Sequence, residues 1–150
     1  MIVTTRVVYQ GIPLLYCYEQ ERNCDYKGII LFFHGFKGAK ENNQRETNDL
    51  AQAGYFAVGV DAIGHGERRY PDFEERFQNA GNAFEVEFIR IVTNTAQEIP
   101  SILDHLITVI PVKTENFGIA GISMGGFITN AAIVVEPRLK AAVSILGSPK

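Results

Sequence analysis

Residues Gly121-Ile122-Ser123-Met124-Gly125 determine how the rest of the chain is interpreted, because they form a G-x-S-x-G pattern. An apolar run typical of a strand ends at Gly121, and a run typical of a helix begins at Met124. In this context the pattern is typical of a nucleophile elbow, a sharp strand-to-helix turn that presents a serine. We expect Gly121 and Gly125 to lie where a Cβ would clash.

Ser123 would stand at the N-terminus of the helix that follows. The helix dipole and its unpaired N–H groups favour negative charge that develops there. Ser123 is therefore the candidate nucleophile. The structural alternative is a glycine-rich turn with an incidental serine, but the strand and helix on either side favour the nucleophile.

Strands and helices alternate along the chain, which predicts right-handed crossovers and a parallel sheet. Residues 2–9 and 12–18 predict an antiparallel pair of strands at a sheet edge. The other predicted elements are strands at 28–33, 55–60, 116–121 and 141–146, helices at 42–53, 84–110 and 124–135, and a polar loop from 61 to about 82. The fold class is α/β, a mostly parallel sheet with helices on both faces, in a single domain over residues 1–150.

The polar residues of interest follow the predicted strands directly. His34 and Gly35 follow the first central strand, Asp61 follows the next, and Ser123 follows the third. The carboxyl ends of parallel strands share one edge of the sheet, where ligands bind in such folds. We therefore expect these residues to form a single site.

Composition excludes several functional classes. The net charge of −3 leaves no basic surface for nucleic acid or anionic membrane. No apolar run approaches the ~20 residues that span a bilayer, and the first residues lack the features of a signal peptide, so we expect a cytoplasmic protein. Cys17 and Cys24 are expected to be free thiols. Their spacing fits no metal site, and we expect no metal or cofactor.

Three motifs in this order resemble the α/β-hydrolase superfamily. They are His34-Gly35-Phe36, the stretch 61–68 (DAIGHGER) and the G-x-S-x-G pattern. Within the superfamily, the chain is most similar to small bacterial esterases of the dienelactone hydrolase and prolyl oligopeptidase-like groups. The resemblance covers the whole chain, which corresponds to the N-terminal portion of such an enzyme.

The resemblance implies a role for each of these residues. Ser123 would attack the acyl carbonyl of a small ester, and the backbone N–H groups of Phe36 and Met124 would form the oxyanion hole. His34 would shape the loop that carries Phe36, and Gly35 would let that loop approach the elbow. Asp61 and the turn 64–66 would be structural and line the rim of the site.

The triad's acid and histidine follow the serine in this superfamily. After Ser123 the chain has one acidic residue, Glu136, at the far end of the elbow helix, and no histidine. The resemblance therefore places both partners beyond residue 150. Among the upstream histidines, His105 is expected to be solvated on the long helix and His65 to lie across from the elbow. His34 is the nearest substitute base; alternatively, it bonds to the backbone of its own loop.

Two other functions remain open at this stage. The chain could belong to a prolyl oligopeptidase-like peptidase, or it could be a truncated, inactive product that acts as a binding or assembly module. In the second case the strand 141–146 would be left as an exposed apolar edge, which favours self-association. If the chain belongs to an esterase, its expected partners are small-molecule ester substrates.

Overall fold

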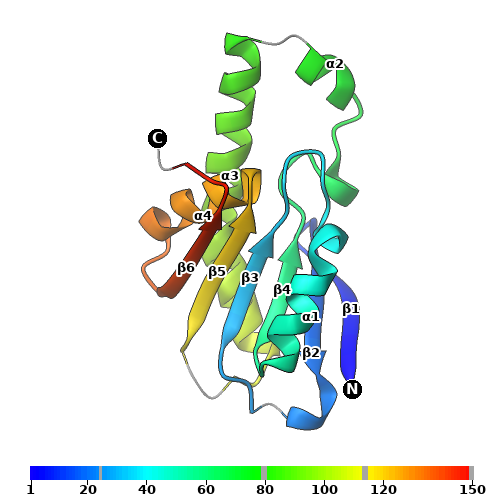
Figure 1. Ribbon diagram of the computed structural model, residues 1–150, viewed down its shortest axis with the longest axis vertical. Helices are drawn as coiled ribbons and strands as arrows, with labels where there is room; N and C mark the ends of the chain where they lie inside the picture. The colour runs from blue at the N-terminus through cyan, green and yellow to red at the C-terminus, as the bar shows by residue number, and fades with distance from the viewer. Residues whose placement is uncertain (24, 79–80, 113–114, 149–150) are drawn as a thin grey trace.

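The structure is a computed structural model that describes all residues except 24, 79–80, 113–114 and 149–150. Its centre is a six-stranded sheet in the order β1-β2-β4-β3-β5-β6 (Figure 1). The strands are β1 (Ile2–Tyr9), β2 (Ile12–Glu19), β3 (Ile29–Phe33), β4 (Phe56–Val60), β5 (Phe117–Ile122) and β6 (Leu139–Ile145). β1, β2 and β4 pair antiparallel, and the other neighbours are parallel. The predicted fold class and the edge pair of strands are confirmed.

Three longer helices cover the two faces of the sheet. α1 (Gln44–Gln52) packs on one face against β2 and β4, whereas α4 (Met124–Val135) packs on the other against β5 and β6, beside α3 (Asn82–Val109) (Figure 1). Short 3₁₀ turns join the elements: η1 (Gln20–Arg22), η2 (Lys40–Asn43) and η3 (Gly66–Arg68). All crossovers bring the chain back to the same edge, so the loops after β3, β4 and β5 meet there.

The main core lies between the sheet and the α3–α4 layer. Leu31, Val58 and Ile119 are fully or almost fully buried on the three central strands, and Ile99 and Leu103 of α3 pack in the same cluster. Each such side chain contributes about 1.5–3 kcal/mol on burial. The continuous apolar runs of these strands follow from their being covered on both faces.

The predicted polar loop after residue 61 contains an additional helix, α2 (Phe73–Gln78). The prediction was wrong here because charged residues dominate the six-residue segment. Phe73 and Phe77 are spaced i, i+4 and therefore share one helix face. Phe73 is buried and Arg76 of α2 pairs with Glu87 of α3, so both apolar and ionic contacts hold α2 in place.

Two other expectations need correction. His105 is half-buried rather than solvated, because its ring stacks on Tyr9 with centroids 4.2 Å apart and its Nε2 lies 3.3 Å from the Tyr16 hydroxyl. The second concerns residues 124–135: their almost uniformly apolar composition predicts a buried helix, yet Val134 on the outer face of α4 is 82% exposed. Cys17 is a free, buried thiol in β2, and Cys24 lies outside the described residues.

β6 is the most exposed strand of the parallel part of the sheet. Among the described residues it pairs only with β5, and Val143 is 54% exposed on it. A groove of about 410 Å³ opens between β6 and α1, lined by apolar side chains that include Ile30, Phe32 and Leu50. The exposed apolar edge that was expected at the last strand is thus present. No helix in the described part of the chain is long and apolar enough to cross a membrane.

Candidate active site

Ser123 stands alone between β5 and α4, at the edge where the loops converge. Its backbone has φ 55° and ψ −114°, in the positive-φ region that residues other than glycine rarely adopt. The residue is exposed, whereas Met124 and Gly125 after it are buried. Its N–H donates to the carbonyl of Ile145 at 2.8 Å, and its own carbonyl accepts the N–H of Gly126 at 2.8 Å. The surrounding hydrogen bonds therefore hold the strained turn in place.

The two glycines of the pattern are required by their surroundings. A Cβ at Gly121 would lie closer than 3.0 Å to the carbonyl oxygen of Gly125, and one at Gly125 would collide in the same way with the carbonyl of Phe33. Gly35 differs. A Cβ there would meet the Ile122 oxygen and the Ser123 Cβ at 3.6 Å, which is ordinary contact. The loop therefore approaches the elbow closely at Gly35, although the space there would also admit a Cβ.

Residues 34–40, which we call the β3 loop, carry Phe36 on a tight turn. The Gly38 N–H donates to the Gly35 carbonyl at 3.0 Å, and Lys37 takes φ 64° at the third position. Phe36 occupies the second position. Neither the Phe36 N–H nor the Met124 N–H donates to any described residue. Two unpaired amides therefore lie in the segments that flank the exposed serine.

His34 is bonded to the backbone through both ring nitrogens. Nδ1 lies 2.8 Å from the Gly35 carbonyl and donates to it, while Nε2 accepts the Ala62 N–H at 3.1 Å. This pairing fixes the tautomer with hydrogen on Nδ1. Burial lowers the pKa of His34. The imidazole is therefore neutral and has no nitrogen free for Ser123, which excludes the substitute base in this arrangement.

His65 lies beneath the surface rather than on a rim. It is fully buried, and its ring packs against those of Phe36 and Phe73 with centroids 5.4 Å and 5.1 Å away. Nδ1 lies 3.0 Å from the carbonyl of Ile63, and the buried Nε2 has no partner among the described residues. Burial lowers its pKa as well.

Aromatic side chains surround the ring of Phe36 and join the β3 loop to the helices beside it. The contacting pairs among the ring of Phe36 and the rings of α2 and the first turns of α3 have centroids 4.7–6.2 Å apart. The cluster consists of Phe36, Phe73, Phe77, Phe84 and Phe88, with Phe127 of α4 against Phe88 at 5.4 Å. Phe127 lies one helical turn beyond Ser123, so the cluster extends to the elbow.

An apolar groove of about 880 Å³ begins at the same place and runs between α3 and α4. Phe127 and Ser148 line the end near the elbow, and Val92, Ala131 and Val134 line the part further along the helices. The volume falls within the range of sites that bind small molecules.

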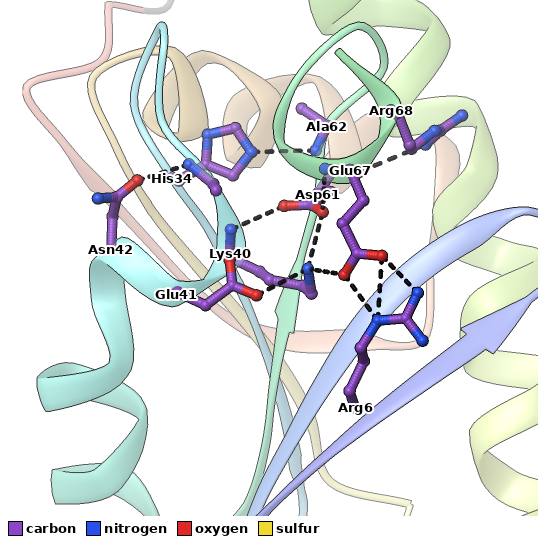
Figure 2. Close-up of polar contacts among 10 residues, drawn as sticks. Arg6, His34, Lys40, Glu41, Asn42, Asp61, Ala62, Glu67 and Arg68 are labelled. Carbon is purple, nitrogen blue, oxygen red and sulfur yellow. Dashed lines mark hydrogen bonds and ion pairs between the residues drawn. The ribbon is translucent and has the colours of Figure 1, made fainter.

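A buried ionic cluster lies under the β3 loop (Figure 2). Asp61, at the end of β4, is fully buried and does not line a rim as expected. Its carboxylate accepts the backbone N–H of Lys40 at 2.8 Å, the Lys40 ammonium at 2.9 Å and the Glu67 N–H at 3.0 Å. The Lys40 side chain is 0% exposed and also contacts Glu67 at 2.7 Å and Glu41 at 2.8 Å.

Charge pairing in this cluster shifts two pKa values. Burial alone would lower the pKa of Lys40, but hydrogen bonds to Glu41, Glu67 and Asp61 more than offset burial and raise it. Hydrogen bonds from Arg6 and Lys40 lower the pKa of Glu67 to about 2. Arg6 reaches Glu67 from β1, through a bidentate contact. Arg6, Lys40 and Glu67 are therefore charged near neutral pH.

A family model described as "Serine aminopeptidase, S33" matches residues 25–149. The chain belongs to this family of serine hydrolases. It is 34% identical over 149 residues to the "Putative esterase YitV" of Bacillus subtilis, which covers 99% of the chain and 56% of that protein. It is 23% identical to the "Esterase YjfP" of Escherichia coli, over 91% of the chain and 52% of that protein. The chain thus spans about half the length of the curated relatives it matches.

The fold of this chain also matches solved structures. A crystal structure described as a "Putative Dienelactone Hydrolase" from Klebsiella pneumoniae superimposes with a TM-score of 0.74 at 20% identity. The match covers 99% of this chain and 61% of that one. It supports the α/β-hydrolase fold, in agreement with the resemblance drawn from the three motifs.

Sequence reasoning missed most of the ionic cluster. It identified Asp61 but not Lys40, Glu67 or Arg6. These residues come from separate segments, and a lysine just before a predicted helix gives no local signal that it will be buried. A usable signal was Gly66: a Cβ there would collide with the Asp61 carboxylate, so the turn 64–66 folds tightly around that side chain.

Proposed function

We propose that Ser123 is the nucleophile of a carboxylesterase acting on small acyl esters. The observation that carries the proposal is the backbone of Ser123, an exposed serine at φ 55° on a strand-to-helix turn. Strain of this kind is concentrated at functional sites. The two curated relatives are both named as esterases, which favours an ester over other acyl substrates.

In the proposed reaction, Ser123 Oγ forms a bond to the acyl carbonyl carbon. The negative charge that develops on the carbonyl oxygen would be stabilised by the free N–H groups of Phe36 and Met124. The helix dipole of α4 adds to this stabilisation. The alcohol then leaves with a proton, and water releases the acid from the acyl-enzyme.

A base is needed to take the Ser123 proton, and the chain's three histidines are otherwise engaged. His34 bonds to Ala62, His65 is buried among aromatic rings, and His105 stacks on Tyr9. We therefore assign the catalytic histidine and its acid to sequence beyond residue 150. The loss of one triad member can reduce turnover by up to about 10⁶, although an oxyanion hole alone retains roughly 10³–10⁴ over water.

The groove between α3 and α4 is proposed to hold the acyl group. It starts one helical turn from Ser123 and its lining is mostly apolar. An ester with an acyl chain of several carbons would place that chain along Phe88 and Ala131. Substitution Ala131→Trp would fill the groove and reduce hydrolysis of an octanoate ester about tenfold relative to the acetate. Equal losses on both esters would contradict this assignment of the groove.

A peptidase is the second candidate, because the family model carries the description of an aminopeptidase. Ester and amide substrates with the same acyl group separate the two activities. We expect the gene product that carries these residues to hydrolyse p-nitrophenyl alanine ester well and alanine p-nitroanilide poorly. Preferential hydrolysis of the anilide would favour the peptidase.

The experiment that tests the proposed nucleophile is steady-state ester hydrolysis by the same gene product. Ser123→Ala should lower kcat by at least about 10³-fold. Ser101→Ala is the matched control, since it removes a serine hydroxyl of α3 that bonds to Tyr9 and does not line the groove, and it should leave kcat within about twofold. If Ser123→Ala retains full activity, the protein is not a Ser123-dependent hydrolase. If the wild type itself hydrolyses no ester, a binding or assembly role is favoured.

A further inference from the structure

The charged side chain of Lys40 is entirely enclosed by protein. Its exposed fraction is 0%, and its ammonium contacts three carboxylates. A lysine is almost never fully buried unless it is paired, because removing the charge from water is costly. Such a residue in a loop next to a catalytic segment requires an explanation beyond general stability, since ion pairs of this kind are weak evidence for stability.

The backbone and the side chain of Lys40 both bond to the same carboxylate, that of Asp61. Its N–H donates to Asp61 Oδ1 at 2.8 Å, and its ammonium donates to Asp61 Oδ2 at 2.9 Å. The last residue of the β3 loop is therefore fixed to the end of β4 by two bonds (Figure 2). Neither bond can shift without leaving a buried charge partly unpaired.

His34, the first residue of the β3 loop, is bonded to Ala62, which follows Asp61 just after β4. His34 Nε2 accepts the N–H of Ala62 at 3.1 Å. Both ends of the β3 loop are therefore anchored on the dipeptide Asp61-Ala62. Phe36 lies between the two anchors, and its N–H points to no partner within the described residues. The anchors at the loop's ends therefore restrict the position of this amide, in addition to the turn bond from Gly38 to Gly35 and the aromatic rings around Phe36.

A second layer holds Asp61 itself in place. The Glu67 N–H donates to Asp61 Oδ2 at 3.0 Å, while the Glu67 carboxylate binds Lys40 and, on its outer side, Arg6. A Cβ at Gly66 would collide with the Asp61 carboxylate, so the turn 64–66 fits closely around that side chain. The cluster therefore links β1 to the β3 loop, and its bonds restrict the movement of Asp61 and Lys40.

We infer that Lys40, through its double contact with Asp61, is a positioning residue for the Phe36 N–H. This inference rests on the proposed function, in which that amide stabilises the oxyanion. A donor of this kind acts only when it is held in place before the reaction, and small displacements reduce its effect. Lys40 touches no substrate. It acts through the loop.

The direct test is the backbone order parameter of Gly35, Phe36 and Lys37 in the 150-residue chain, from ¹⁵N relaxation. In the wild type these amides should be rigid, at about 0.85, and Lys40→Met should lower them to about 0.6 or less. Glu67→Gln removes one partner of Lys40 and should lower them by a smaller amount. Glu136→Gln is the matched control: it neutralises a buried, paired carboxylate at the opposite end of α4 and should leave them unchanged.

Glu67→Gln decides the test if Lys40→Met does not fold, because Glu67 is more exposed than Lys40. Unchanged order parameters in a folded Lys40→Met protein, or in Glu67→Gln when Lys40→Met does not fold, would overturn the inference. A change of the same size in the Glu136→Gln control would also overturn the inference, because the loss of order would then follow from neutralising any buried carboxylate.

Kinetics of the gene product that carries these residues provide a second readout. Removal of one oxyanion donor typically lowers kcat about 10²–10³-fold, so a misplaced donor in Lys40→Met should lower kcat by about 10–100-fold with KM nearly unchanged. A rise in KM without loss of kcat would contradict the positioning role. If Ser123→Ala leaves activity intact, the proposed function fails, yet the order parameters still decide whether Lys40 holds the loop.

Discussion

The two sides of Ser123 differ in how far their side chains are buried and paired. On one side, residues 34–40 and 61–68, which we call the closed side, bury a lysine and an aspartate in a paired cluster. On the other, the outer face of α4 and the strand β6, the open side, leave Val134 82% and Val143 54% exposed. The difference indicates that the closed side holds the β3 loop by itself, whereas the open side presents apolar surface that other residues could cover.

The largest expected effect is on the closed side, at Asp61. Asp61→Asn leaves the enclosed Lys40 ammonium without the one carboxylate partner that is itself fully buried among the described residues, and breaking a buried pair in this way costs about 3–5 kcal/mol. Asp104→Asn is the control, because Asp104 forms an exposed pair with Arg138. It should cost less than about 1 kcal/mol. Urea unfolding of both variants measures the difference, and equal losses would remove the distinction between the two sites.

The next effect concerns the junction of the two sides, where α4 meets β3. Gly125→Ala places a Cβ against the carbonyl of Phe33 and should destabilise the fold by about 1–3 kcal/mol or more. Gly35→Ala makes only ordinary contacts at 3.6 Å and should change stability by less than about 0.5 kcal/mol. Thermal unfolding compares the pair. A tolerated alanine at position 125 would show that α4 is not held against β3 as described.

The pH dependence of stability provides a smaller effect on the closed side. Glu67 has a pKa of about 2 in the folded protein against an ordinary value of 4.5. A depressed folded pKa means that its contribution is present above pH 4.5 and is lost as the pH falls toward 2. The difference in urea midpoint between the wild type and Glu67→Gln should therefore shrink over that interval. A difference that stays constant across it would contradict the ion pairing of Glu67.

The smallest effect on stability is expected on the open side. Val143→Lys exchanges an exposed apolar side chain for a charge on an edge strand, and its free energy of unfolding should change by less than about 0.5 kcal/mol. Its effect should instead be on association. We expect the wild-type chain to self-associate through β6 as its concentration rises in sedimentation experiments, and the lysine variant to remain monomeric. Identical sedimentation of both proteins would argue against pairing at this edge.

The sequence predicted the features that depend on local patterns. Apolar runs located the central strands, and the G-x-S-x-G pattern located the turn at Ser123 with the two glycines that its packing requires. It did not predict the ionic cluster, because Arg6, Lys40, Asp61 and Glu67 are brought together only by the sheet. It also missed α2, whose six residues are too few for a periodic signal.

Burial was the least predictable property. The apolar composition of α4 and of residues 141–146 is the same whether or not something covers them, so exposure of Val134 and Leu146 could not be read from these segments alone. The environment of His105 was missed for a related reason. Its partners Tyr9 and Tyr16 belong to the first two strands, about 90 residues away along the chain.

The central claim is that Ser123 is the nucleophile, and the most direct measurement is mass spectrometry of the gene product after reaction with a fluorophosphonate. We predict a single phosphonyl adduct on the peptide that contains Ser123, absent from Ser123→Ala and unchanged in Ser101→Ala. An adduct on a different residue, or undiminished labelling of Ser123→Ala, would contradict the account.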